Sequence, residues 1–203
     1  MIKGDLRKFL KNERRKGLFK ALGLFRRSEA AELLEFALAL PLILVMLVGV
    51  LDFASAYHLK QILANAAREG ARLAASEPII DESQSSPGSV QAVYEDVTTY
   101  LQDAGVNTSF IGSSMSYNTS TGTATYYTTS GGNTYGLIIN RQYYITTNPD
   151  GTPIDPPVLA NQVTLICPYD WTYGFNNVIK LLIPSASVPG NMTITVDAAM
   201  PQL

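Results

Sequence analysis

The chain has 203 residues, of which 46% are hydrophobic and only 16% are charged, whereas an ordinary soluble domain has roughly 25% charged residues. It contains a single Cys and a single His. These counts exclude an intramolecular disulfide framework, a CxxC-type zinc site and a multi-histidine metal centre. We therefore expect neither a metal nor another cofactor.

The charge is distributed very unevenly along the chain. Residues 1–30 contain ten of the 15 Lys and Arg residues and three acidic ones, which gives a net charge of +7, whereas the remaining 173 residues carry −9. Such an asymmetry indicates a basic tail or a membrane topology signal. Because an apolar run follows, we interpret residues 1–30 as a basic cytoplasmic leader and expect no binding to nucleic acid.

An uncharged run extends from Phe36 to Leu51. A helix over these 16 residues is only ~24 Å long, but extension to Tyr57 gives ~33 Å, which spans a ~30 Å hydrocarbon core. Asp52 then lies near the end of the span, and we interpret it as an interfacial residue, with an assembly contact between subunits as the alternative. The basic flank predicts a cytoplasmic N-terminus and an exported C-terminal domain.

The helical period continues beyond the apolar run and predicts one helix from about Glu32 to Ser76, kinked at Pro41. In its second half, small residues recur every four positions in two neighbouring rows. This spacing lets two helix backbones approach closely, although Ala is also simply a good helix former. The residues predicted to pack against a partner helix are Ala66, Ala67, Gly70, Ala71, Ala74 and Ala75.

The C-terminal part is predicted to be a small α+β domain at residues 90–203, which follows a long helix at 31–76 and a polar linker at 77–89. A short helix is expected from about residue 90 to residue 101, with Ser89 as its N-cap and Gly105 at its end. Residues 175–183 are either a short helix or a strand. Thr- and Tyr-rich segments predict a mostly antiparallel meander of strands near 112–117, 123–129, 135–147, 161–167 and 191–198.

The junction RRSEAAELLEFALALP, residues 26–41, places the acidic Glu35 directly before the apolar run. Cleavage between Ala30 and Ala31 would create an ammonium group one helical turn from Glu35, which is a favourable i, i+4 pair. An ionisable residue at a membrane segment is a functional hypothesis by default. We therefore predict that Glu35 sets the register of this helix beside its neighbours.

Residues 35–75 resemble the N-terminal region of TadE-like proteins, which are minor pilins (pseudopilins) of the bacterial tight-adherence, Flp-type pilus system. The resemblance rests on four features: Glu35-Phe36-Ala37, Pro41 within the apolar run, the pair Asp52-Phe53, and the stretch NAAREGAR at residues 65–72. At the cleavage position, this chain has Ala30 where the family usually has Gly.

The resemblance implies a prepilin-type leader, residues 1–30, that a prepilin peptidase removes on the cytoplasmic side. It also implies a pilin-like lollipop, in which a single-pass helix in the bacterial inner membrane carries a small exported domain. The expected partners are the cytoplasmic membrane, other pilins and pseudopilins, and pilus assembly proteins. The expected role lies in adhesion pilus assembly and secretion, and not in catalysis.

One alternative is a secreted soluble protein with a long signal peptide. Ala54-Ser55-Ala56 fits an A-x-A cleavage site, so the product would begin at Tyr57. The two residues most suited to chemistry have simpler interpretations. We expect His58 to lie in the interfacial belt of the membrane and Cys167 to be a buried, inert thiol on a strand.

Overall fold

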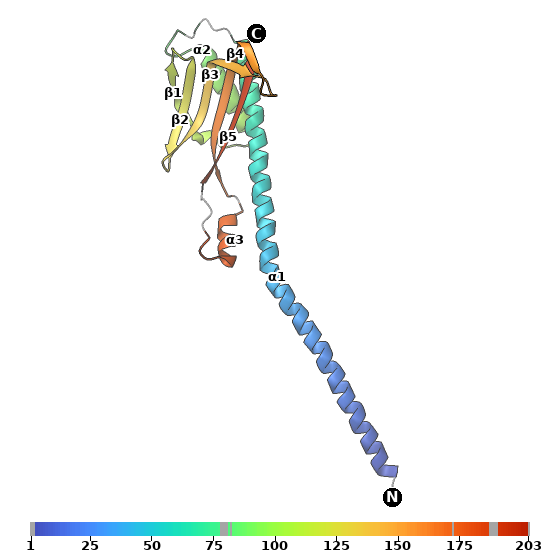
Figure 1. The fold of residues 1–203 in the computed structure, drawn as a ribbon. Coiled ribbons are helices and arrows are strands. Elements are labelled where there is room, and N and C mark those ends of the chain that lie inside the picture. Colours follow the sequence, from blue (N-terminus) through green and yellow to red (C-terminus); the bar gives the residue numbers. More distant parts are fainter. Residues whose placement is uncertain (1–2, 78–80, 82, 172, 187–190, 203) are drawn as a thin grey trace. The chain divides into compact units, whose positions relative to one another are not determined.

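The computed structural model describes residues 3–77, 81, 83–171, 173–186 and 191–202 (Figure 1). Its helices are α1 (Lys3–Ser76), α2 (Gly88–Asp103), the 3₁₀ helix η1 (Thr108–Phe110) and α3 (Phe175–Leu182). Its strands are β1 (Ile111–Asn118), β2 (Thr123–Ser130), β3 (Asn133–Thr147), β4 (Pro153–Asp170) and β5 (Asn191–Pro201). The fold is therefore α+β, as the sequence predicts, with a long N-terminal helix and a small domain.

Helix α1 begins at Lys3 and not near Glu32, where the sequence analysis placed its start. Residues 3–30 are rich in Lys, Arg and Leu, which favour helix, and the first proline of the chain is Pro41. The helix continues through Pro41 to Ser76. The predicted leader is thus helical in the uncleaved chain.

Tertiary contacts divide the described chain within α1 into two compact units. Unit 1 comprises Met1–Val50 and Gly174–Ser187, and unit 2 comprises Leu51–Tyr173 and Val188–Leu203. The sequence analysis divided the chain into segments 1–30, 31–76, 77–89 and 90–203, and so kept residues 31–76 of this helix together in one segment. The difference arises because the second half of α1 belongs to the core of unit 2.

The five strands form one antiparallel sheet in the order β1-β2-β3-β4-β5, which confirms the predicted meander. A two-residue loop joins β2 to β3, and both of its glycines have positive φ, +59° at Gly131 and +81° at Gly132. This is the backbone that a tight hairpin turn requires. Strand β4 begins at Pro153, eight residues before the predicted start at 161.

The core of unit 2 lies between the sheet and the two helices α1 and α2 (Figure 1). Alternate residues of the central strands point inward, as a sheet covered on one face requires. Helix α2 is tied to β2 by the stacked rings of Tyr94 and Tyr126, whose centroids lie 4.2 Å apart. The sheet contributes Leu137, Ile139, Val163, Leu165, Ile194 and Val196, and α2 contributes Val90, Val93, Val97 and Leu101.

The start of α2 differs from its prediction. The residue that precedes the helix is Pro87, and Ser89 lies inside the first turn. The carboxylate of Asp81 accepts hydrogen bonds from the Ser89 backbone N–H and from its hydroxyl, both at 2.8 Å. Pro87 has no side-chain acceptor that could cap the helix. The cap therefore comes from Asp81 in the linker. The end of the helix is as predicted, with Gly105 at φ +76° just beyond it.

Candidate functional site

Helix α1 presents an exposed, mostly apolar surface between Ala31 and Leu51. Between Ala31 and Leu51, most side chains are exposed, and the large ones include Leu38 at 72%, Leu33 at 69% and Val50 at 66%. Soluble monomers rarely leave such a continuous apolar surface in water. Within the described residues, Ala31–Ser76 is the one helix that is long and apolar enough to cross a membrane. This surface indicates a membrane anchor.

The predicted cleavage and registry residues directly precede the uncharged run of Phe36–Leu51. The side chains of Ala31 and Glu35 are exposed on α1. Ala30 is helical, but its side chain lies outside the described part of the structure. The roles of these three residues in cleavage and registry remain predictions.

Asp52 is fully buried, and the structure gives it a place that the sequence did not suggest. Its Oδ1 accepts a hydrogen bond of 2.7 Å from the Tyr173 backbone N–H, and its backbone carbonyl accepts one of 2.9 Å from the Tyr169 hydroxyl. The adjacent Phe53 packs edge-to-face on Trp171. Asp52 therefore makes contacts within the chain and is not exposed at the edge of the span, because Tyr169 at the end of β4 and Tyr173 just after it bind to it.

The rows of small residues in α1 are buried inside unit 2. All five alanines are at most 7% exposed, and Gly70 is buried as well. A Cβ atom added at Gly70 would lie 2.5 Å from Cγ2 of Val97 on α2 and 3.5 Å from Cγ1 of Val163 on β4. The close approach predicted for these residues therefore occurs with the chain's own α2 and sheet. A helix from another subunit would have to pack against a different face.

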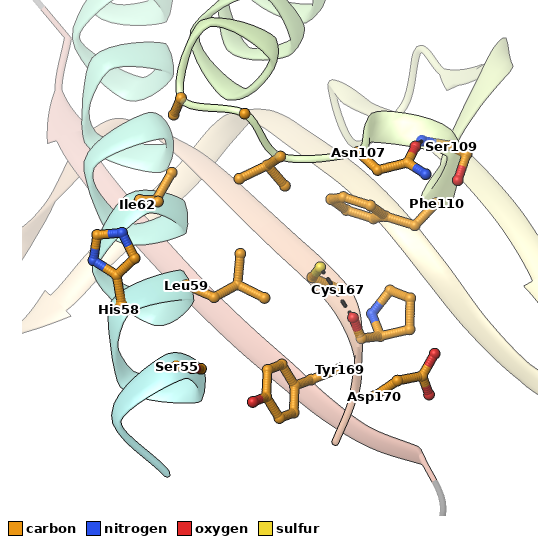
Figure 2. A pocket seen from close by; sticks show the side chains of 14 residues that line it. Ser55, His58, Leu59, Ile62, Asn107, Ser109, Phe110, Cys167, Tyr169 and Asp170 are labelled. Atoms are coloured by element: carbon orange, nitrogen blue, oxygen red, sulfur yellow. Dashed lines mark hydrogen bonds between the residues drawn. The ribbon is translucent and has the colours of Figure 1, made fainter. Parts of the chain in front are cut away.

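A cavity of about 560 Å³ opens beside α1 in unit 2 (Figure 2). Its walls come from α1, the loop after α2, η1 and the end of β4. Figure 2 shows Leu59 and Ile62 of α1 facing Phe110 and Cys167 across the cavity. His58 and Asp170 lie at opposite sides of it. The walls are thus mixed, with an apolar centre and polar residues toward the outside.

The chemistry available in this cavity is limited. Burial raises the pKa of the Cys167 thiol to about 12, so the thiol is protonated at neutral pH and is a weak nucleophile. The thiol donates a hydrogen bond of 3.3 Å to the Pro168 carbonyl. His58 is exposed on α1, as an interfacial residue would be. Among the described residues, the structure contains no group of three or more His, Cys, Asp or Glu side chains placed to hold a metal ion.

Sequence reasoning missed one buried charge, Arg141 on β3. This side chain is fully buried, and its Nη2 donates a hydrogen bond of 2.9 Å to the carbonyl of Glu77, just after α1. Arg141 thereby fixes the chain where it leaves the helix. A signal was present in the sequence, because Arg141 continues the inward alternation of Leu137 and Ile139 and is the first basic residue after Arg72.

One comparison with known families identifies the helix that carries these features. Residues 31–72 match the family model of TadE-like proteins. The matched segment begins at Ala31 and contains the exposed apolar surface, Asp52 and most of the buried small residues. Neither the curated proteins nor the solved structures include a significant match to this chain.

The match confirms the resemblance that the sequence analysis drew from Glu35-Phe36-Ala37 and from NAAREGAR. The TadE-like segment covers the exposed apolar part of α1 and most of the part that is buried in unit 2. Together with the candidate membrane span, it indicates a membrane-anchored protein associated with a Tad pilus.

Proposed function

We propose that this protein is a minor pilin-like subunit, or pseudopilin, of a bacterial tight-adherence, Flp-type pilus assembly and secretion system. It would act without catalysis, by anchoring in the inner membrane and by packing its helix beside other pilin helices. Its N-terminus would face the cytoplasm, and its sheet domain would lie outside the cytoplasmic membrane. A prepilin peptidase would remove residues 1–30.

The observation that carries this proposal is the contrast between the two parts of α1. Residues 31–51 present large apolar side chains outward, whereas Leu63, Ala67 and Ala71 of the same helix are fully buried in the domain core. An exposed apolar helix can pack equally well in lipid or in a bundle of similar helices, since both surroundings are apolar. The TadE-like match begins at Ala31. Removal of the predicted leader would make this same residue the new N-terminus.

Glu35 gives this helix a polar group at the start of its apolar surface. Its side chain is exposed within the chain. After cleavage, the carboxylate would lie one helical turn from the ammonium group of Ala31, in the same subunit or in a neighbouring one. Such a charge pair is worth more in an apolar bundle than in water, so it favours one register over others.

The structure weighs against the alternative of a secreted protein cleaved after Ala56. That cleavage would remove Asp52, whose carboxylate and carbonyl hold Tyr173 and Tyr169. It would also cut α1 within a continuous helical segment, next to Leu59, which packs against the core. A soluble product that begins at Tyr57 would therefore lose contacts on which the end of β4 depends.

The direct test is to compare Glu35→Gln with Glu32→Gln in cells that assemble the pilus. Both residues are exposed acids near the start of the mature helix. We expect both variants to reach the membrane at normal levels. Glu35→Gln should lower surface pilus assembly several-fold, whereas Glu32→Gln should leave it close to the wild-type level. Full assembly with Glu35→Gln would contradict the registry role.

A further inference from the structure

The segment between β4 and β5 has the composition of a membrane-surface element. We call Trp171 and residues 173–186 the α3 insert. It begins with alternating aromatic residues, Trp171, Tyr173 and Phe175, and continues into α3. Within α3, Phe175, Val178 and Ile179 are half-buried, whereas Asn177 and Lys180 are exposed. These residues place an apolar face and a polar face on one short helix.

Helix α3 lies beside the apolar part of α1 within unit 1 (Figure 1), and Phe175 makes the contact. A Cβ atom added at Gly49 would lie 3.1 Å from Cε2 of Phe175, so the ring is seated directly on the glycine. Gly49 is buried, and Val45 and Val48 on the same face of α1 are half-buried, whereas Met46 and Leu47 between them are exposed. The contact lies within the uncharged run of Phe36–Leu51, which is the surface that indicates a membrane anchor.

The position of Gly49 along α1 gives the expected depth of this contact. A hydrocarbon core of ~30 Å takes up about 20 helical residues. If the span begins at Ala31, Gly49 lies ~2 Å inside its far boundary, and if it begins at Phe36, Gly49 lies ~9 Å inside. Amphipathic helices that lie on membranes are buried ~5–10 Å below the headgroups. In both registers, the contact between α1 and α3 therefore lies within ~9 Å of the far boundary of the hydrocarbon, at or above the depth that such helices reach.

The start of the insert is fixed to α1 in unit 2, just after this point. The Tyr173 backbone N–H donates to the Asp52 carboxylate, and Trp171 packs edge-to-face on Phe53. A carboxylate at the edge of the hydrocarbon is costly unless it is covered and hydrogen-bonded. Its burial under the insert explains how an acid is accommodated at position 52.

Three of the exposed side chains of the insert, those of Tyr173, Lys180 and Ile183, suit a lipid surface. Tyr173 is 52% exposed and Ile183 is 53% exposed. Tyr and Trp favour the headgroup level, where their rings are half apolar and half polar. The exposed Lys180 can extend to lipid phosphates while its methylene chain stays in apolar surroundings.

We propose that the α3 insert is a second membrane contact, which lies in the phospholipid interface on the side where α1 joins the sheet domain. Its occupant is lipid, because the insert is continuous with the exposed apolar surface of α1. This inference requires only that α1 anchors the protein in a membrane. It does not depend on the proposed role of the protein in a pilus.

The test uses the single Trp of the chain, Trp171, as a reporter of depth. The full-length protein is reconstituted in phosphatidylcholine–phosphatidylglycerol vesicles whose acyl chains carry bromine either near the headgroups or near the bilayer centre. Two further variants lack Trp171, which is replaced by Phe, and carry one new Trp at another position. Tyr173→Trp places it in the insert, and Tyr144→Trp places it on β3 as a matched control, since Tyr144 is 56% exposed and Tyr173 is 52% exposed.

The control residue, Tyr144, lies in the sheet, far along the chain from the insert. Tyr144 pairs with Leu159 of β4, 12 residues before Trp171, which corresponds to roughly 40 Å along an extended strand. In the Tyr173→Trp variant, we expect shallow bromines to quench roughly half of the emission and deep bromines to quench less, because an interfacial segment lies ~5–10 Å deep. Trp171 of the unaltered chain should show the same order. The Tyr144→Trp variant should show little quenching by either lipid.

Vesicle flotation separates the possible failures. If the protein floats with the vesicles and the Tyr173→Trp reporter is quenched no more than the Tyr144→Trp reporter, the proposed contact is wrong while the anchor stands. If the protein does not float, both the anchor and the contact are wrong. Because the unaltered chain carries its own Trp, a folding defect in one variant cannot decide the result.

Discussion

Gly70 occupies the point where α1 comes close to both α2 and β4. We predict that Gly70→Ala lowers the free energy of unfolding of the sheet domain. The new Cβ would lie 2.5 Å from the stiff, branched side chain of Val97. Overpacking of this kind costs ~1–3 kcal/mol, which outweighs the ~1 kcal/mol that Ala gains over Gly in a helix. Denaturant unfolding of the detergent-solubilised protein measures the effect.

The control for Gly70 is Gly88→Ala at the start of α2. A Cβ there meets only Asp81 Oδ2, at 3.8 Å, which is an ordinary contact. We expect this variant to unfold at the wild-type denaturant concentration or slightly above it. Equal stability of Gly70→Ala and the wild type would show that Val97 can move aside, and would remove the reason for glycine at this position.

Replacement of Asp52 is expected to have opposite effects on membrane retention and on the stability of the fold. Replacement by Leu should strengthen membrane retention, because it removes a charge from the edge of the span. The same change removes the acceptor of the Tyr173 N–H, and an unsatisfied buried donor costs ~1–3 kcal/mol. We predict that Asp52→Leu stays in the membrane after a carbonate wash but exposes residues 173–186 to protease.

Asp52→Asn separates the charge from the hydrogen bond, since its side-chain carbonyl still accepts from Tyr173. We expect this variant to resist protease more than Asp52→Leu does. If both variants were cut as slowly as the wild type, the hydrogen bond would have no part in holding the insert against α1.

At the scale of elements, the junction between α1 and α2 depends on Asp81. Burial raises the pKa of its carboxyl, but the two hydrogen bonds from Ser89 and the nearby charge of Arg141 lower it, and the net pKa lies below its ordinary value. A lowered folded pKa means that the carboxylate stabilises the fold above the unfolded value of about 4. This stabilisation is lost as the pH falls through the lower, folded value.

We therefore predict that Asp81→Ala costs ~1 kcal/mol at pH 7, as the loss of a helix cap does. The difference from the wild type should shrink below about pH 4. Urea unfolding at pH 7 and at pH 3 measures both values. Asp103→Asn removes a charge from the other end of α2 and should be neutral or slightly stabilising, because an acid there opposes the helix dipole. A pH-independent difference at Asp81 would contradict the role of its charge.

At the scale of the whole molecule, the decisive property is where the mature chain begins. We predict that the protein isolated from membranes starts at Ala31, because the TadE-like match begins there. Intact mass and N-terminal sequencing measure this directly. A start at Tyr57 would establish the secreted alternative and end the pilin proposal. A start at Met1 would rule out cleavage between Ala30 and Ala31.

Several properties of this protein are determined by its sequence alone, because each depends on contiguous residues. The basic leader, the run from Phe36 to Leu51 and the continuing helical period predict an anchored helix without any tertiary information. The motif NAAREGAR is equally local, and the family match confirms the resemblance that it suggested. Turn residues between Thr- and Tyr-rich segments predict an antiparallel meander for the same reason.

Only the tertiary structure decides which residues cover each face of the long helix. The partner of Asp52 lies 121 residues away in the chain, and the partner of Gly70 is α2 and not another subunit. The burial of Arg141 and the seating of Phe175 on Gly49 likewise depend on segments that are distant in sequence. Periodicity shows that a face of a helix is apolar or small, but not what packs against it, since that choice depends on the packing of the whole chain.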